Sequence, residues 1–347
     1  MKIFHLPPIL SVAAIAAAFA LLSGCYTLTQ GTTMLGYLSR AIPLEQVSDS
    51  DFVHLVADIR SFAMNELGLA ESKNYTRYVE LDRNYLAAIV SASDKASFDR
   101  YEWNYPVVGR LPYKGFFNVE GAHRERNRLQ KLDLDVWIRS VDAFSTLGWF
   151  RDPLYSYMRS YSIDRLAELI IHELVHATVF IKGHANFNEE LAQFIGDEGA
   201  RLYMETRYGL DSDEYRQMLS SEENSRRFVA FLQELIAELE TLYSNEDLQR
   251  DEILIRKEQI INAAKERFDA EYESRFTNDN YRNFSTVPVN NAYLELFRLY
   301  YTPDNFYEDL FERTGRDLPA FVAAAKTIKR RNAAPPRTQL ENALTSN

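Results

Sequence analysis

The stretch His172–Phe194, HELVHATVFIKGHANFNEELAQF, holds three of the six histidines of the 347-residue chain, with carboxylates between them. On a helix, His172 and His176 lie one turn apart on the same face, where two imidazoles can hold one Zn²⁺. Glu173 has the position of the general base that activates water in HExxH enzymes. The alternative is a helix with two surface histidines. We favour the metal site because the neighbouring residues are uncharged, as a buried helix requires: Ile170, Ile171, Leu174, Val175 and Ala177.

A catalytic zinc usually takes three protein ligands and leaves one position for water. His184 lies eight residues after His176, whereas the metzincin pattern needs a Gly and a His at shorter spacing, where Val179 and Lys182 stand. We therefore interpret His184 as a loop residue.

Glu189 is the better third ligand. Small side chains share its helix face, at Ala192, Gly196 and Ala200, and would let this helix lie close to the zinc helix. Glu190 points about 100° away on ideal geometry. We predict that Glu190 is a partly exposed carboxylate, which could border the cleft.

The composition narrows the class of partner. A hydrophobic share of 46% is ample for a packed core, and the net charge of −11 argues against nucleic acid or anionic lipid as the main partner.

The N-terminus predicts export and a lipid anchor. Lys2 and the apolar run Ile9–Leu22 are typical of a signal peptide, here residues 1–24, and the run ends in Leu-Ser-Gly-Cys25, which resembles a bacterial lipobox. The alternative is a plain secretory signal. We expect acylation of Cys25, so that the protein is an exported bacterial lipoprotein on a membrane, facing the periplasm or the cell exterior. As the only cysteine, Cys25 leaves no internal disulfide possible.

The rest of the chain predicts an α+β fold. A helical segment, 44–69, precedes strand-like segments at 85–93, 105–117 and 134–150, and charged residues 211–276 fit two long helices joined near Ser244. We expect five parts after the signal peptide: a helical and β-sheet part (25–160), the zinc-binding helices (161–210), the helical hairpin (211–276), a C-terminal helical part (277–330) and a disordered tail (331–347).

Asn188–Ala192 resembles the NExxA segment that supplies the third ligand of gluzincin peptidases. The wider chain resembles the bacterial "putative aminopeptidase" lipoproteins through six segments: IRSFAMNELGL, YPVVGRLPYKGFF, DAFSTLGWFRDPL, IIHELVHATVF, FNEELAQFIGDEGA and NNAYLELFRLYY. They run from about Ile59 to Phe321. The resemblance implies a zincin-like fold with a small mixed sheet, one zinc per chain and peptidase activity. The chain departs from this family at Asn104 and Arg110, near which relatives carry cysteines; this concerns stability and redox context.

The remaining machinery is assigned by resemblance and residue type. Gluzincins bind the substrate backbone along an edge strand, a role that the resemblance implies for Phe144, Ser145, Thr146, Leu147 and Gly148; a buried core strand is the alternative. The oxyanion donor could be Tyr300 or Tyr301, Asn290 or Asn291. The carboxylate for a substrate amine could be Asp142, Asp152 or Glu190.

We therefore expect a zinc peptidase of peptides or proteins, an aminopeptidase in which His172, His176 and Glu189 hold zinc and Glu173 is the base. One alternative is an endopeptidase with the same site. The other is a non-catalytic zinc-containing lipoprotein scaffold whose hairpin binds a protein partner.

Overall fold

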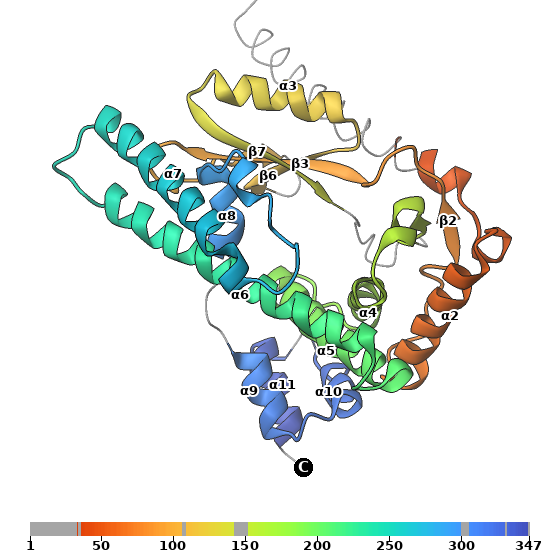
Figure 1. The fold of residues 1–347 in the computed structure, drawn as a ribbon. Coiled ribbons are helices and arrows are strands. Elements are labelled where there is room, and N and C mark those ends of the chain that lie inside the picture. Colours follow the sequence, from red (N-terminus) through yellow and green to blue (C-terminus); the bar gives the residue numbers. More distant parts are fainter. Residues whose placement is uncertain are drawn as a thin grey trace, which may run out of the picture. The chain divides into compact units, whose positions relative to one another are not determined.

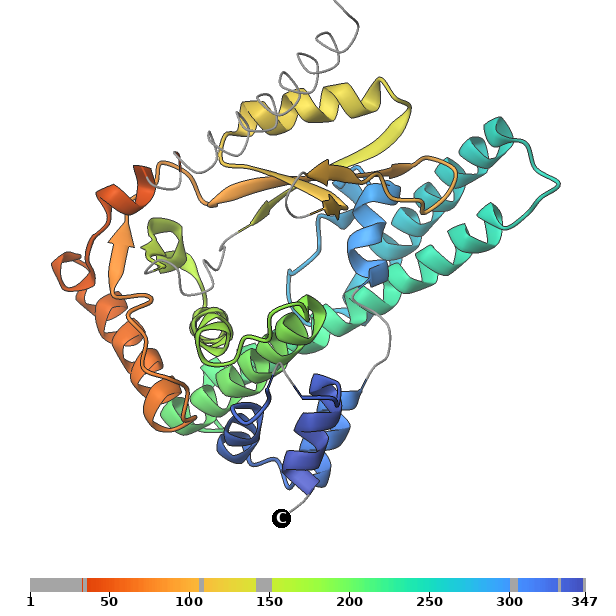
Figure 2. The same cartoon turned by 180° about the vertical axis from the view of Figure 1, so that it is seen from behind.

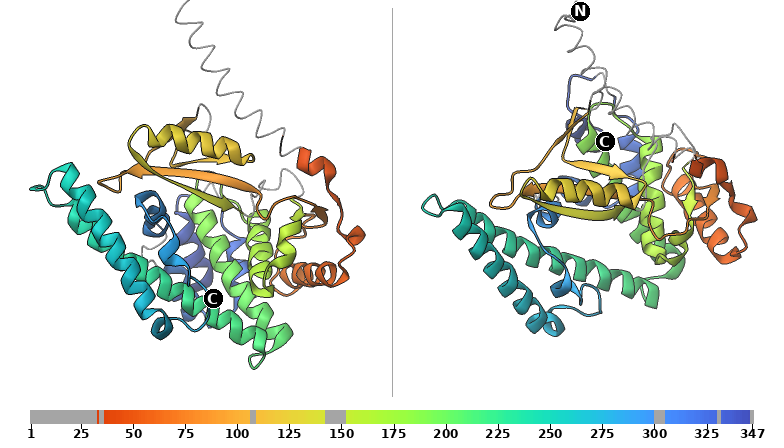
Figure 3. Two further views of the ribbon diagram at one scale, coloured as in Figure 1. Left: turned by 45° about the horizontal axis from the view of Figure 1, so that its top comes forward. Right: turned by 90° about the horizontal axis from the view of Figure 1, so that it is seen from above.

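Strand β3 (Ala87–Asp94) is the centre of a sheet with the order β6-β3-β7, and both of its neighbours, β6 (Tyr113–Phe116) and β7 (Leu134–Val141), are antiparallel to it. Alternate β3 residues, Ala88, Val90 and Ala92, face a core that helix α3 (Val119–Gln130) closes with Ala122 and Leu129. Figure 3 shows α3 along one face of this sheet.

The computed structural model describes residues 33, 36–105, 109–141, 152–299, 305–329 and 332–345. They form an α+β fold of two units. The sheet unit contains, of the described residues, 33, 36–40, 85–105, 109–141 and 289–295; the helical unit contains the others. The sheet unit also holds the β4–β5 pair (Trp103–Tyr105 and Gly109–Leu111).

The helical unit begins with β1 (Ile42–Pro43), which pairs antiparallel with β2 (Arg77–Val79); β2 pairs parallel with β8 (Leu154–Tyr155). Its helices are α2 (Ser50–Asn65), α4 (Ile163–Thr178), α5 (Ala185–Tyr208), α6 (Asp213–Tyr243), α7 (Arg250–Arg275), α9 (Phe306–Arg313), α10 (Leu318–Ala325) and α11 (Pro336–Thr345), with 3-10 turns η1 (Leu44–Gln46), η2 (Ser156–Ser160) and η3 (Phe284–Thr286). Helix α8 (Asn291–Leu299) begins in the sheet unit and ends in the helical unit. Figure 1 labels most of these elements.

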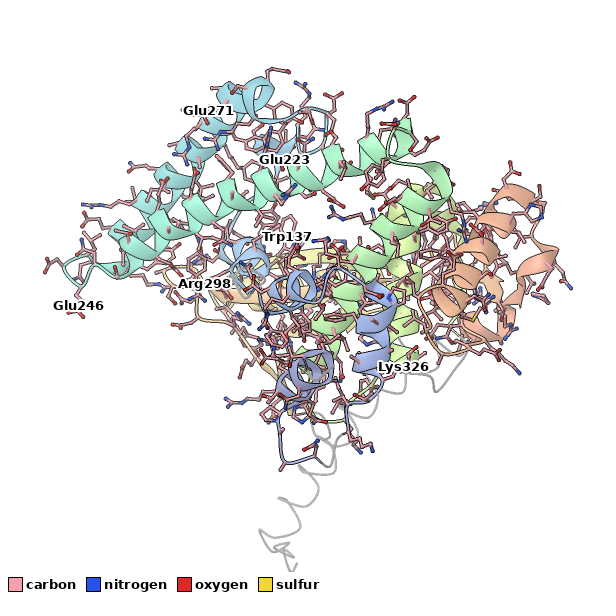
Figure 4. The ribbon with its side chains drawn as sticks, turned by 90° about the horizontal axis from the view of Figure 1, so that it is seen from below. Trp137, Glu223, Glu246, Glu271, Arg298 and Lys326 are labelled. Carbon is pink, nitrogen blue, oxygen red and sulfur yellow. The ribbon has the colours of Figure 1, made fainter. Side chains whose placement is uncertain are left out.

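The predicted hairpin is formed by α6 and α7, two long antiparallel helices that Figure 2 shows from behind. Ser212 caps α6 by accepting a hydrogen bond from the Tyr215 N–H. Figure 4 labels Glu246, which lies in the connection between the two helices, and Glu223 and Glu271. Glu223 and Glu271 each pair with an arginine of their own helix, so the charged side chains of the hairpin largely form a solvated face.

Two predicted segments differ in the structure. The segment 331–347, predicted to be a disordered tail, contains helix α11, because Leu340 is fully buried and anchors it. The segment 105–117 is two short strands, β5 and β6, after the end of β4, and residues 106–108 lie outside the described part. Strand β7 ends at Val141, and the rest of the predicted strand, 142–150, is also outside it.

No helix in the described part of the chain is long and apolar enough to cross a bilayer.

Candidate metal centre

Helix α4 carries the two histidines on one side and the core on the other. Leu166, Ala167, Ile170, Ile171, Leu174 and Val175 are buried. Their helical spacing holds α4 in the helical unit and leaves the stripe Glu168, His172, His176 at intervals of four residues. The helix ends at Thr178, whose hydroxyl donates to the Leu174 carbonyl and accepts the Ala70 N–H.

Helix α5 lies against α4 because glycines face it. A Cβ atom at Gly196 would lie 3.1 Å from the His172 Cβ and 3.3 Å from the Glu168 carbonyl oxygen. At Gly199 it would lie 3.0 Å from a methyl group of Ile171. Both approaches are tighter than an ordinary contact, so larger residues would push the two helices apart.

The loop between α4 and α5 is held by Asn188. Its side-chain oxygen accepts the Ile181 N–H at 2.8 Å, and its amide donates to the Ile181 carbonyl at 3.1 Å. Asn188 is buried, and it directly precedes Glu189. These two bonds therefore set where the first turn of α5 starts relative to the end of α4.

The three predicted ligands converge. The Glu189 carboxylate oxygens lie 3.8 Å from the His172 Nε2 and 3.5 Å from the His176 Nε2, and one ligand atom from each residue lies within 4.8 Å of the others. A tetrahedral zinc with bonds of about 2.0–2.1 Å separates its ligand atoms by about 3.4 Å. The donor set therefore fits zinc in both chemistry and spacing.

The protonation states also suit a metal. Burial, and then the neighbouring His176, lower the pKa of His172 to about 4, so its imidazole is neutral at pH 7. Contact with His176 lowers the pKa of Glu189, so its carboxylate stays ionised. The histidine side chains are 16% and 3% exposed, whereas that of Glu189 is 67% exposed, so the carboxylate side of the site faces solvent.

Glu173 is also buried, on the same helix as the two histidines. Its charge acts on the phenol of Tyr75, which lies between α2 and β2 and is fully buried. Tyr75 was not predicted from the sequence, since a single tyrosine among 21 carries no local signal.

Beside the ligands, the polar stripe continues across the two helices. The Gln193 amide lies 3.4 Å from a Glu168 oxygen and 2.9 Å from an Asp197 oxygen. Burial, and then the Asp197 charge, raise the pKa of Glu168 to about 7. Glu168 was not predicted as a site residue, although its position four residues before His172 places it on the same face of the helix.

Two of the carboxylates considered for a substrate amine lie in the described part, Glu190 and Asp152. Glu190 lies 2.7 Å from an Arg337 nitrogen of α11. Asp152 is buried, and its backbone N–H donates to the Asn74 side chain. The metal-type cluster of the described residues does not include His184. His184 is the N-cap residue of α5.

Asn290 and Asn291 have contacts within the sheet unit. The Asn291 amide donates to the carbonyls of Asp94, Lys95 and Ser97, and the Asn290 amide donates to that of Val136. These bonds use the donor groups that an oxyanion would need. The remaining predicted residues lie outside the described part: Cys25, Asp142, Phe144, Ser145, Thr146, Leu147, Gly148, Tyr300 and Tyr301.

The comparisons with known proteins bear on the family of the chain. No curated protein and no solved structure matches the chain. One family model matches residues 43–340, a range that includes α4, α5 and all three residues of the metal-type cluster. On this match the chain belongs to the family described as "Putative aminopeptidase".

Proposed function

We propose that this protein is a zinc-dependent aminopeptidase with a gluzincin-type site on a zincin-like fold. The observation that carries the proposal is the convergence of His172, His176 and Glu189 in a spacing that suits zinc, with buried Glu173 on the same helix. A structural zinc site needs no such base, so Glu173 favours an enzyme over a scaffold.

One zinc ion per chain would be held by the two Nε2 atoms and the Glu189 carboxylate. When bound, it would polarise the scissile carbonyl and the attacking water. Glu173 would accept a proton from that water and pass it to the leaving amine. The neutral imidazole of His172 and the ionised Glu189 are the forms that bind a cation.

Two substitutions separate the roles. Glu173→Gln keeps the size of the side chain but cannot accept the proton, so zinc content should stay near one per chain while kcat falls by about 10²–10⁴-fold. Glu189→Gln should weaken zinc binding itself. Zinc is measured by mass spectrometry and turnover on a peptide library; Glu173→Gln turnover equal to wild type would refute the mechanism.

The same library distinguishes the alternatives. An aminopeptidase removes the first residue of peptides with a free amine and spares acetylated copies, whereas an endopeptidase cuts both. If the wild-type protein binds zinc but cuts no peptide, the interpretation as a non-catalytic scaffold replaces the interpretation as an enzyme.

A further inference from the structure

The N-terminal end of α5, which carries the ligand Glu189, has no side-chain cap. The N-cap residue His184 makes no capping hydrogen bond with its side chain, and the first turn of the helix contains no acidic residue. Such an end frays readily, because the first N–H groups of a helix have no partner within it. The Glu189 side chain is 67% exposed, so packing does not hold it either. The position of this ligand therefore depends on what binds the neighbouring residues of α5.

Glu190, the next residue, is bound by the C-terminal helices. An Arg337 nitrogen of α11 lies 2.7 Å from the Glu190 Oε2 atom, and the Tyr307 hydroxyl of α9 lies 3.5 Å from the same oxygen. The Arg337 side chain is 35% exposed and that of Glu190 is 41% exposed. An ion pair this exposed adds little to the free energy of unfolding of the whole protein. We therefore expect its effect to be local, on the turn of α5 that carries Glu189.

Aromatic side chains hold the Arg337 guanidinium. Its Cζ atom lies 5.0 Å from the ring centre of Phe306 and 5.5 Å from that of Tyr307. The Tyr307 ring stacks on Phe194 of α5 at 5.7 Å, and Phe187, near the start of α5, lies 6.5 Å from it. The direction from which the guanidinium approaches Glu190 is therefore set by packing between α9 and α5.

Two contacts thus flank Glu189 in the sequence. Asn188 binds the loop before α5, and Glu190 binds α11. The second contact joins residues that are 147 positions apart, so it ties the helix with the carboxylate ligand to the last helix of the described chain.

We propose that Arg337 is a positioning residue of the metal centre. Through Glu190 it holds the turn of α5 that aims the Glu189 carboxylate at His172 and His176. By pairing with Glu190, it also leaves Glu189 as the carboxylate that is free to bind zinc. The inference rests on the proposed zinc peptidase function, and it adds the C-terminal helix to the structure that supports the site.

Arg337→Gln tests the assignment, because it removes the charge and keeps a polar side chain. The full chain, purified in detergent, should bind zinc about 10-fold more weakly, the lower end of the usual range for losing a group that orients a metal ligand. Competition with a chelator measures this affinity. The visible absorption spectrum of the Co²⁺-loaded protein should change with the ligand geometry, and amide hydrogen exchange should become faster in residues 186–190. Arg337→Lys, which keeps the charge, should restore part of the affinity.

Arg313→Gln is the matched control. Arg313 of α9 pairs with Glu341 of α11 at 3.0 Å, and this exposed pair joins α11 to α9 rather than to α5. If Arg337 only helped α11 to dock, Arg313→Gln should weaken zinc binding by as much. We expect its zinc affinity and Co²⁺ spectrum to equal those of the wild type.

The possible failures are distinguishable. If Arg337→Gln binds zinc as tightly as the wild type, or if Arg313→Gln is weakened equally, the role of Arg337 is refuted while the zinc site stands. If the two variants differ as expected but the wild type cuts no peptide, the role of Arg337 at the metal centre stands and the peptidase function fails. If the wild type binds no zinc, both fail.

Discussion

Asn188 shows how one residue can position a ligand that it does not touch. Its amide satisfies both backbone groups of Ile181, which is itself buried, and so ties the loop before α5 to the first turn of that helix. Glu189 follows directly on the chain. The position of the Glu189 carboxylate therefore depends on two hydrogen bonds made one residue earlier.

Asn188→Ala should weaken zinc binding by about 10- to 100-fold, the usual scale for losing a group that orients a metal ligand. It should also cost about 1–3 kcal/mol in free energy of unfolding, because two buried backbone groups lose their partner. Competition with a chelator and urea denaturation measure the two effects. Asn186→Ala, at an exposed position of the same helix, is the control. Zinc affinity equal to wild type would show that the loop does not position Glu189.

At the scale of elements, the site is made by two antiparallel helices, α4 and α5. The pairs His176 with Glu189 and Glu168 with Gln193 follow each other along the interface, as antiparallel helices require. Gly196 and Gly199 allow the close approach. The ligand geometry is therefore a property of the helix pair and of the small residues between them.

Gly196→Ala should disturb the site more than the fold. Alanine is the better helix former by about 1 kcal/mol, but overpacking typically costs about 1–3 kcal/mol. We expect the free energy of unfolding to fall by about 1 kcal/mol. Zinc affinity should be at least about 10-fold weaker, because the new methyl group presses on His172. Competition with a chelator and urea denaturation again measure the two effects. Glu205→Ala, at an exposed position of α5, is the control. Unchanged zinc affinity would mean that α5 can shift without moving the ligands.

At the scale of the whole molecule, each unit is built from separate stretches of the chain. The predicted part 25–160 does not stay together: α2 and β2 belong to the unit that contains α4 and α5, whereas β3, α3 and β7 belong to the other. The loop with Tyr75 and the helix with Glu173 thus share a unit although about a hundred residues separate them.

The lipid anchor is also a property of the whole molecule, and it remains a prediction from the sequence around Cys25. Cys25→Ser should leave the protein without acyl chains, so it should move from the membrane fraction to the soluble fraction. Fractionation after a high-salt wash, with an immunoblot, is the measurement. If Cys25→Ser still sediments with membranes, something other than acylation holds the protein there.

The sequence by itself determined the features that depend on local spacing. Residues at i and i+4 share a helix face whatever the rest of the chain does, so the shared face of His172 and His176 was predictable. The charged helical hairpin was predictable from its composition. Glu189 was predictable because small residues at helical spacing marked the face that packs.

Only the tertiary structure decided what depends on contacts between distant segments. Asn188 binds Ile181 across a loop, and the segment that contains Tyr75 is held by two bonds to distant residues, from the Ala70 N–H to Thr178 and from the Tyr75 N–H to the Asp152 carbonyl. The tail illustrates the same limit, since α11 is stabilised by burial of Leu340 and by the pairing of Arg337 with Glu190. Periodicity records which face of a helix is apolar; it does not record which distant segment covers that face.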